Sequence, residues 1–338
     1  MIKGFFDIQF RMDDLTKNGD PLVHLNERVD WEVFRADLET IRKKGRKSAA
    51  GRKPFDTMLM FKILVLQSLY NLSDDAVEYQ VRDRLSFMRF LGLGIGDRVP
   101  DAKTIWLFRE QLGEAKLVKR LFKKFDHYLR EQGFKARKGQ IVDASLVSVP
   151  IQRNSREENR QIKEGSKPEG WSEAKSRQKD IHARWSARTH KHAYGYKNHI
   201  SIDSKHKLIR DYAVTDAAVH DSQVFSELLD DTNSSRDVWA DSAYRSESNR
   251  NELKQRKYRE HLQRKGCRHK MLTEWEKQGN RTRSRIRCRI EHVFGVQAQM
   301  AGNLLLRSIG IARAEIKIGL RNLAYNIHRM GTLEPSTA

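Results

Sequence analysis

The sequence predicts an all-α segment followed by an α/β domain with a mixed sheet. Apolar residues recur with helical periodicity as far as Gly133, and beyond it the pattern changes to short runs rich in β-branched and aromatic residues. Helix candidates lie between and after those runs, which is the order of an α/β layer. The 338 residues are enough for two domains or one large one. We expect a first domain over 1–134, a second over 135–331 and a tail over 332–338.

The first domain is expected to be helical between residues 30 and 133. Its apolar run "TMLMFKILVLQSLY" at 57–70 is typical of a buried helix, and a single helix is expected over 74–91. The last helix, "AKLVKRLFKKFDHYLREQ", places apolar residues at helical intervals among lysines and arginines, so its outer face is basic. The start and stop signals are, in chain order, Pro54, Ser73 or Asp74, Gly92 or Gly94, Pro100 with Asp101, and Gly133.

The second domain carries several runs of strand length. They are rich in β-branched or aromatic residues. The expected order is three strands, helix, strand, helix, strand, helix. The strand candidates span 139–149, 195–203, 206–214, 237–244 and about 258–264, and the helix candidates include 220–231, 284–300 and 312–329.

Residues 151–191 interrupt this order. The segment has eleven Lys/Arg and six Asp/Glu, several glycines and serines and no sustained periodicity, which is typical of a mobile loop. It is either a solvated insertion with no specific role or a basic flap that orders on a phosphate backbone.

The chain is strongly basic. Lys and Arg total 65 against 44 Asp and Glu, which gives a formal net charge of +21. Such an excess favours a polyanionic partner, of which nucleic acid is the first candidate. Charge alone attracts phosphate without regard to sequence, so a merely soluble or ribosome-adherent basic protein is the alternative at this point.

No segment is expected to cross a membrane. The longest apolar run is interrupted by Lys62 and is shorter than the roughly 20 residues that a spanning helix needs. The N-terminal residues include acids where a signal peptide needs an unbroken apolar core. We therefore expect a cytoplasmic protein.

The two cysteines, Cys267 and Cys288, are too few for a disulfide scaffold and fit a reducing cytosol. With His269 and His292 they could form a Cys/His cluster. Their spacing is not that of a common zinc module and a basic loop would repel the ion, so zinc is not expected.

Two aspartates lie inside strand candidates that are otherwise apolar. Asp143 lies in "QIVDASLV" and Asp241 in "VWADSAY", each beside small residues that leave room for a ligand. An isolated buried carboxylate is costly unless it is paired or binds a metal. Either aspartate alone would more often cap a turn or pair with arginine. Two of them on separate strands of one sheet favour a shared site.

A third carboxylate, Glu291, follows five arginines in "RTRSRIRCRIEHVFG". On a helix, Arg283, Arg287 and Glu291 form one i, i+4 row beside an apolar stripe that starts at Ile286. Glu291 is therefore expected at the edge of the helix face that packs on the sheet. The alternative is a surface ion pair between Arg287 and Glu291, worth roughly a few tenths of a kcal/mol.

Three converging carboxylates would repel one another unless divalent cations neutralised them. Carboxylate oxygens are hard ligands that select Mg²⁺ or Mn²⁺ rather than zinc. Two such ions about 4 Å apart activate a water or hydroxyl on one side of a phosphodiester and stabilise the leaving oxygen on the other. Nearby arginines and lysines would hold the phosphate chain. The residues thus predict metal-assisted phosphoryl transfer.

These motifs together resemble the bacterial DDE transposases of the insertion-sequence-five group. The resemblance covers nearly all of the chain and implies a ribonuclease-H-like catalytic domain behind a helical domain. It rests on seven segments in the family's order, namely "GRKPFDTMLMFKILVLQSLYNLSDDAVEYQVRDRLSFMRFLGL", "VPDAKTIWLFREQL", "IVDASLV", "YGYKNHISID", "VTDAAVHDSQV", "WADSAYRS" and "RCRIEHVFG".

The resemblance assigns the catalytic acids. Asp143, Asp241 and Glu291 would be the catalytic and metal-binding residues, with two Mg²⁺ or Mn²⁺ ions in each site. The wider superfamily has a Tyr, Arg, Glu, Lys signature around the glutamate. In this chain Arg287 and Glu291 match it, whereas Ser284 replaces the tyrosine. Ala298 replaces the lysine, so only half of the signature is present.

The resemblance also implies an activity and its partners. The activity would be metal-dependent hydrolysis at the transposon ends, followed by attack of the freed 3′ hydroxyl on target DNA. The helical domain would bind the terminal inverted repeats of double-stranded DNA, and two protomers would pair the ends, as a homodimer or higher oligomer. A bacterial, nucleoid-associated location follows from the same resemblance.

Further residues are expected to contact DNA. They precede Glu291 on its helix, lie on the second strand of the domain, or follow Asp241 closely. The expected DNA-binding residues are Arg283, Arg285, Arg287, Lys197, Asn198, His199, Tyr244 and Arg245. Ordinary packing is the alternative for His199 and Tyr244, and His220 and Asp221 are expected to cap a helix.

Two other functions share this scaffold. One is a transposase-derived DNA-binding protein without catalytic activity, against which the three acids argue, because carboxylates facing phosphate would weaken its affinity. The other is a nuclease of the same fold that cuts without strand transfer.

Overall fold

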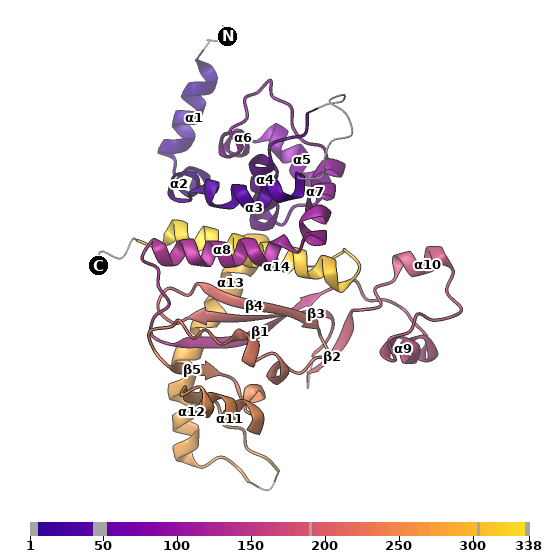
Figure 1. Ribbon diagram of the computed structural model, residues 1–338, viewed down its shortest axis with the longest axis vertical. Coiled ribbons are helices and arrows are strands. Elements are labelled where there is room, and N and C mark those ends of the chain that lie inside the picture. The colour runs from indigo at the N-terminus through magenta and orange to yellow at the C-terminus, as the bar shows by residue number, and fades with distance from the viewer. Residues whose placement is uncertain (1–5, 43–52, 189–190, 269, 303–304, 335–338) are drawn as a thin grey trace. The chain divides into compact units, whose positions relative to one another are not determined.

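The computed structural model describes residues 6–42, 53–188, 191–268, 270–302 and 305–334 (Figure 1). They fall into two compact units. One comprises Met1–Gly133 with Gly319–Ala338, and the other comprises Phe134–Ile318. No helix within the described ranges is long and apolar enough to cross a membrane.

The first unit is built from helices around α4, which corresponds to the buried helix expected at 57–70. Asp56 begins α4 by accepting hydrogen bonds from the backbone N–H groups of Met58 and Leu59. The helices and 3-10 turns are α1 (Asp7–Lys17), α2 (Pro21–Arg28), η1 (Trp31–Phe34), α3 (Arg35–Glu39), η2 (Thr40–Arg42), α4 (Thr57–Tyr70), α5 (Asp74–Asp83), α6 (Leu85–Leu91), α7 (Ala102–Glu114) and α8 (Leu117–Glu131).

The start and stop residues refine the expected boundaries. Ser73 caps α5, Asp101 caps α7, and Gly92 ends α6 in the left-handed conformation. The single helix expected over 74–91 is wrong, because Arg84 is extended and divides it into α5 and α6. The guanidinium of Arg84 lies over the ring of Phe87, 4.4 Å from its centroid.

The second unit contains a mixed six-stranded sheet. β3 pairs antiparallel with β1, β2 and β4, and β1 then pairs parallel with β5, which pairs parallel with β6. Four strands paired antiparallel, β1 to β4, extended by the parallel strands β5 and β6, confirm the expected ribonuclease-H-like domain. The strands are β1 (Gln140–Ser148), β2 (Arg184–Arg188), β3 (Lys191–Asp203), β4 (Ile209–Asp216), β5 (Asp237–Ala240) and β6 (Arg259–Leu262).

Helices flank this sheet. α13 crosses behind the sheet and α12 continues from it past β5, while α9 and α10 lie to one side (Figure 1). The segment 151–191, which the sequence predicts to be a mobile loop, contains two helices and β2. The helices of this unit are α9 (Arg156–Lys163), α10 (Glu173–Gln178), α11 (Glu247–Gln255), α12 (Glu274–Arg287) and α13 (Arg289–Ala301). A further helix, α14 (Ile311–Thr332), begins in this unit, and its residues from Gly319 belong to the first unit.

The helix expected at 220–231 is wrong. The chain forms two 3-10 turns instead, η3 (Asp221–Gln223) and η4 (Ser226–Leu228). His220 caps η3, but Asp221 turns its carboxylate toward Lys197 and does not cap a longer helix. The apolar residues of this segment are buried against β1 and β5.

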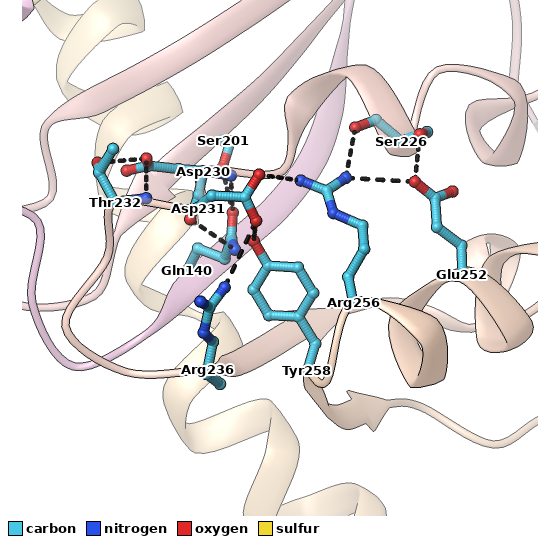
Figure 2. Close-up of polar contacts among 10 residues, drawn as sticks. All are labelled: Gln140, Ser201, Ser226, Asp230, Asp231, Thr232, Arg236, Glu252, Arg256 and Tyr258. Carbon is cyan, nitrogen blue, oxygen red and sulfur yellow. Dashed lines mark hydrogen bonds and ion pairs between the residues drawn. The ribbon is translucent and has the colours of Figure 1, made fainter.

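A polar network holds the chain after η4 against the start of β1 (Figure 2). Asp231 accepts hydrogen bonds of 2.6 Å from the Tyr258 hydroxyl and from Arg256 Nη2. Gln140 Oε1 accepts one of 2.8 Å from the backbone N–H of Asp230. Since Gln140 is the first residue of β1, the network fixes the end of the strand that leads to Asp143.

Candidate active site

β1 presents Asp143 on the sheet face opposite the apolar cluster of the second unit. Its neighbour Val142 lies in that cluster with Val238 and Ala240 of β5, and successive strand residues point to opposite faces. Asp143 pairs with Ile200 of β3 and its side chain is 16% exposed. A carboxylate this far buried requires a cationic or hydrogen-bonding partner.

Asp241 follows β5 directly, as the next residue after Ala240. The parallel pairing of β1 with β5 ends with Ile141 opposite Trp239, two residues before Asp143 and Asp241 respectively. Adjacent strands are about 4.8 Å apart. Asp241 Oδ1 also accepts a 2.6 Å hydrogen bond from the backbone N–H of Ala243, which starts the turn after β5.

Glu291 lies in the first turn of α13, beside two fully buried residues, Ile290 and Val293. Its own side chain is 64% exposed, which places it at the edge of the buried helix face. The single helix expected at 284–300 is wrong in one respect, because the helix is interrupted at Cys288 and forms two helices, α12 and α13. The Glu291 backbone N–H bonds to the Cys288 carbonyl, three residues back, at this break.

Arg287 lies between two of the three acids. Its Nη1 donates a 2.8 Å hydrogen bond to Asp143 Oδ2, and its Nη2 lies 3.8 Å from Glu291 Oε1. The i, i+4 pair with Glu291 is thus the looser of the two. The tighter partner, Asp143, is 144 residues away in the sequence.

The donor set suits a hard divalent cation. Asp143 and Glu291 face one cationic group, and Asp241 has no ion-pair partner among the described residues. All three are carboxylates, the ligand class of Mg²⁺ and Mn²⁺. Across the same residues, no three acidic, His or Cys side chains lie together as a metal-binding group, and Arg287 provides the positive charge between two of the acids.

Arginines gather beside this end of the sheet. Arg245, just after Asp241, and Arg250 both pair with Glu260, at 3.3 and 3.0 Å. Burial lowers the pKa of Arg283, and the neighbouring charges of Arg264 and Arg245 lower it further, while Glu260 opposes them. Positive charge therefore exceeds negative charge here, and an anion would relieve the repulsion.

Arg264 is a member of this group that the sequence analysis missed. It follows β6, which is parallel to β5, so it lies at the same sheet edge as Asp241. Parallel strands end at one edge of a sheet, and that rule could have identified it. Arg264 also pairs with Glu276 at 2.7 Å and lies over the Trp275 ring.

Three residues expected to contact DNA from β3 are buried instead. Lys197 is 6% exposed, Asn198 2% and His199 fully buried. Lys197 Nζ pairs with Asp221 at 2.8 Å, and His199 Nε2 is 2.9 Å from the Thr215 hydroxyl. No phosphate oxygen can reach side chains enclosed in this way, so packing is the role that the structure supports.

Tyr244 is also fully buried, 5.5 Å from the ring of Phe225. Its neighbour Arg245 is partly exposed. Of the eight residues expected to contact DNA, four keep exposed surface: Arg245, Arg283, Arg285 and Arg287. Cys267 and Cys288, considered above for zinc, are exposed free thiols, and His269 lies outside the described residues.

Two family models match the chain. One, described as a transposase DDE domain, matches residues 135–327, and the other, described as a transposase domain (DUF772), matches residues 10–111. Among solved structures, the cryo-EM structure of the piggyBac transposase synaptic complex with hairpin DNA is similar at 13% identity and a TM-score of 0.45, over 92% of this chain and 74% of that chain. The transposase DDE domain model covers more than half of the residues of this chain, so the chain belongs to the DDE transposase family.

Proposed function

We propose that this transposase is a member of the insertion-sequence-five group and that Asp143, Asp241 and Glu291 form its catalytic site. The observation that carries the proposal is that Asp143 and Glu291 face one cation, while the parallel pairing of β1 with β5 ends two residues before Asp143 and Asp241. The reaction is hydrolysis of a phosphodiester at each transposon end, followed by attack of the freed 3′ hydroxyl on target DNA.

Two Mg²⁺ or Mn²⁺ ions, when bound by these carboxylates, would activate the attacking oxygen and stabilise the leaving oxygen. The chain supplies the framework for that chemistry. β1 and β5 fix two of the acids on a rigid sheet, and α13 fixes the third through its buried face. Rigid placement of the reacting groups lowers the entropic part of the barrier.

DNA is the proposed partner, held by arginines at the same sheet edge. Arg245, four residues after Asp241, lies close enough to Arg283 for their charges to interact, and the chain as a whole carries a net charge of +21. Guanidinium groups bind phosphate oxygens in bidentate geometry. The helical first unit would bind the terminal inverted repeats, and two or more protomers would pair the ends in the cytoplasm of a bacterium, at the nucleoid.

The test is cleavage and joining of a labelled duplex that carries the element's own ends, with wild type beside Asp143→Asn. Joined products from wild type alone support the transposase and its site together. Cleavage without joining supports a nuclease of the same fold. Binding without cleavage in either protein would support a catalytically inactive DNA-binding protein.

A further inference from the structure

Arg287 occupies the position between two acids where the proposed function requires a metal ion. It lies 2.8 Å from Asp143 Oδ2 and 3.8 Å from Glu291 Oε1. The Asp143 and Arg287 side chains are only 16% and 21% exposed. A partly buried pair is screened less by solvent than a surface pair, so this contact competes with any other cation for Asp143.

The surroundings of Arg287 leave it able to change partners. It is the last residue of α12, and the helix breaks at the next residue, Cys288, before α13 begins. Its Nε is buried and has no hydrogen-bond partner among the described residues. A guanidinium with an unsatisfied N–H has a binding position left for another acceptor.

We propose that Arg287 holds Asp143 and Glu291 until a divalent cation replaces it, and that the displaced guanidinium then binds a DNA phosphate. The inference rests on the proposed function, since it concerns the same carboxylates. It makes Arg287 a positioning residue and a competitor for the metal. It also explains how two acids tolerate each other without bound metal, because the guanidinium places a positive charge between them and reduces their repulsion.

Linkage follows from this exchange. If phosphate binds the displaced form of Arg287, DNA raises the affinity for metal, and metal raises the affinity for DNA by the same factor. The transposase would then load its metals chiefly when a transposon end is present. Glu291, which is 64% exposed, is the partner that Arg287 can release first, since that contact is also the longer one.

The experiment measures Mn²⁺ binding by electron paramagnetic resonance on the full chain without DNA. Arg287→Gln removes the competing charge and is expected to bind Mn²⁺ about tenfold more tightly than wild type. Arg281→Gln is the matched control, because Arg281 is an exposed arginine of α12 whose bond to Gln278 involves neither acid. Equal or weaker Mn²⁺ binding by Arg287→Gln would overturn the proposal.

A second measurement does not depend on one variant folding well. Arg287→Lys keeps the charge but loses the forked geometry, so its Mn²⁺ affinity should lie between those of wild type and Arg287→Gln. A short duplex of the transposon end should raise the Mn²⁺ affinity of wild type and leave that of Arg287→Gln unchanged. An equal effect of DNA on both proteins would also count against the exchange.

Failure of the proposed function can be distinguished from failure of the Arg287 exchange. If the proposed function is wrong, Asp143→Asn would bind Mn²⁺ as well as wild type does, whatever the Arg287 variants show. Thermal unfolding gives an independent readout, because Arg287→Gln removes the ion pair between Arg287 and Asp143. Without metal, the melting temperature of Arg287→Gln should lie below that of wild type. Mn²⁺ should raise the melting temperature of Arg287→Gln by more than it raises that of wild type.

Discussion

Lys197 and Asp221 form an ion pair inside the second unit, with Nζ 2.8 Å from Oδ1 and side chains only 8% and 10% exposed. Lys197 also donates a 2.6 Å hydrogen bond to the carbonyl of Val219. Strand alternation places Lys197 on the sheet face opposite Asp143, since its partner in β1 is Leu146. This lysine therefore connects β3 to the segment at η3 and is turned away from Asp143.

Lys197→Met should destabilise the fold and leave DNA affinity unchanged. Removing Lys197 breaks a buried ion pair with Asp221, which typically costs about 3–5 kcal/mol. Urea unfolding measures the loss, and the double variant with Asp221→Leu should recover part of it because no charge is then buried alone. A stable Lys197→Met protein with weakened DNA binding would restore the DNA contact expected from the sequence.

Arg283→Ala should weaken DNA binding and reduce its dependence on salt. Each phosphate contact adds about one unit to the slope of log Kobs against log salt concentration, so one lost contact should lower the slope by about 1. Arg259→Ala is the control, because Arg259 begins β6 at the end away from Asp241 and pairs with Asp237. If both variants changed the slope equally, the arginines beside Asp241 would have no special part in holding DNA.

Five of the six strands of the described sheet could be predicted, because each has the composition and length that a sheet imposes. The exception is β2, which lies in the polar segment expected to be a loop. Asp143 and Asp241 could be proposed as site residues for the same reason, since a carboxylate in an apolar strand is conspicuous. The contact of Arg287 with Asp143 could not, because helical periodicity relates only residues three or four apart, and this contact spans 144 positions. The break at Cys288 has no proline or glycine to mark it.

The burial of Lys197 and His199 could not be predicted from the sequence. Alternation indicates that these two residues share one sheet face and that Asn198 lies on the other. It does not indicate which face packs against the core, because that depends on segments distant in the sequence, here the residues around η3 and η4. The polar character of these strand residues predicts exposure, whereas Lys197 pairs with the buried Asp221 and His199 Nε2 contacts the Thr215 hydroxyl.

Gly195→Ala should disrupt the pairing of β1 with β3. Gly195 has φ +153°, and a Cβ there would lie 2.2 Å from the carbonyl oxygen of Val147, a backbone atom that cannot move aside cheaply. We expect a loss of several kcal/mol, on the order of the largest single-residue effects. Gly295→Ala is the contrasting variant, because Gly295 is helical with open space and alanine there should stabilise by up to about 1 kcal/mol. Equal unfolding midpoints for the two variants would contradict this account of the close approach between β1 and β3 at Gly195.

His199 should make the transposase less stable as the pH falls below neutrality. Burial lowers its pKa to about 4, with Asp221 opposing the shift and Lys197 adding to it. An unfolded chain has the ordinary histidine value near 6.5, so it takes up the proton first, and stability is lost as the pH falls from about 6.5 toward 4.

Between pH 7 and pH 5 the loss attributable to His199 should be about 2 kcal/mol. His199→Gln has no ionisable group at this position, so its unfolding free energy should change less over the same interval. His328, whose pKa burial also lowers, is present in both proteins, and its contribution cancels in the comparison. Urea unfolding at the two pH values measures the difference, and an identical pH dependence would mean that the imidazole takes up its proton as readily in the folded chain as in the unfolded one.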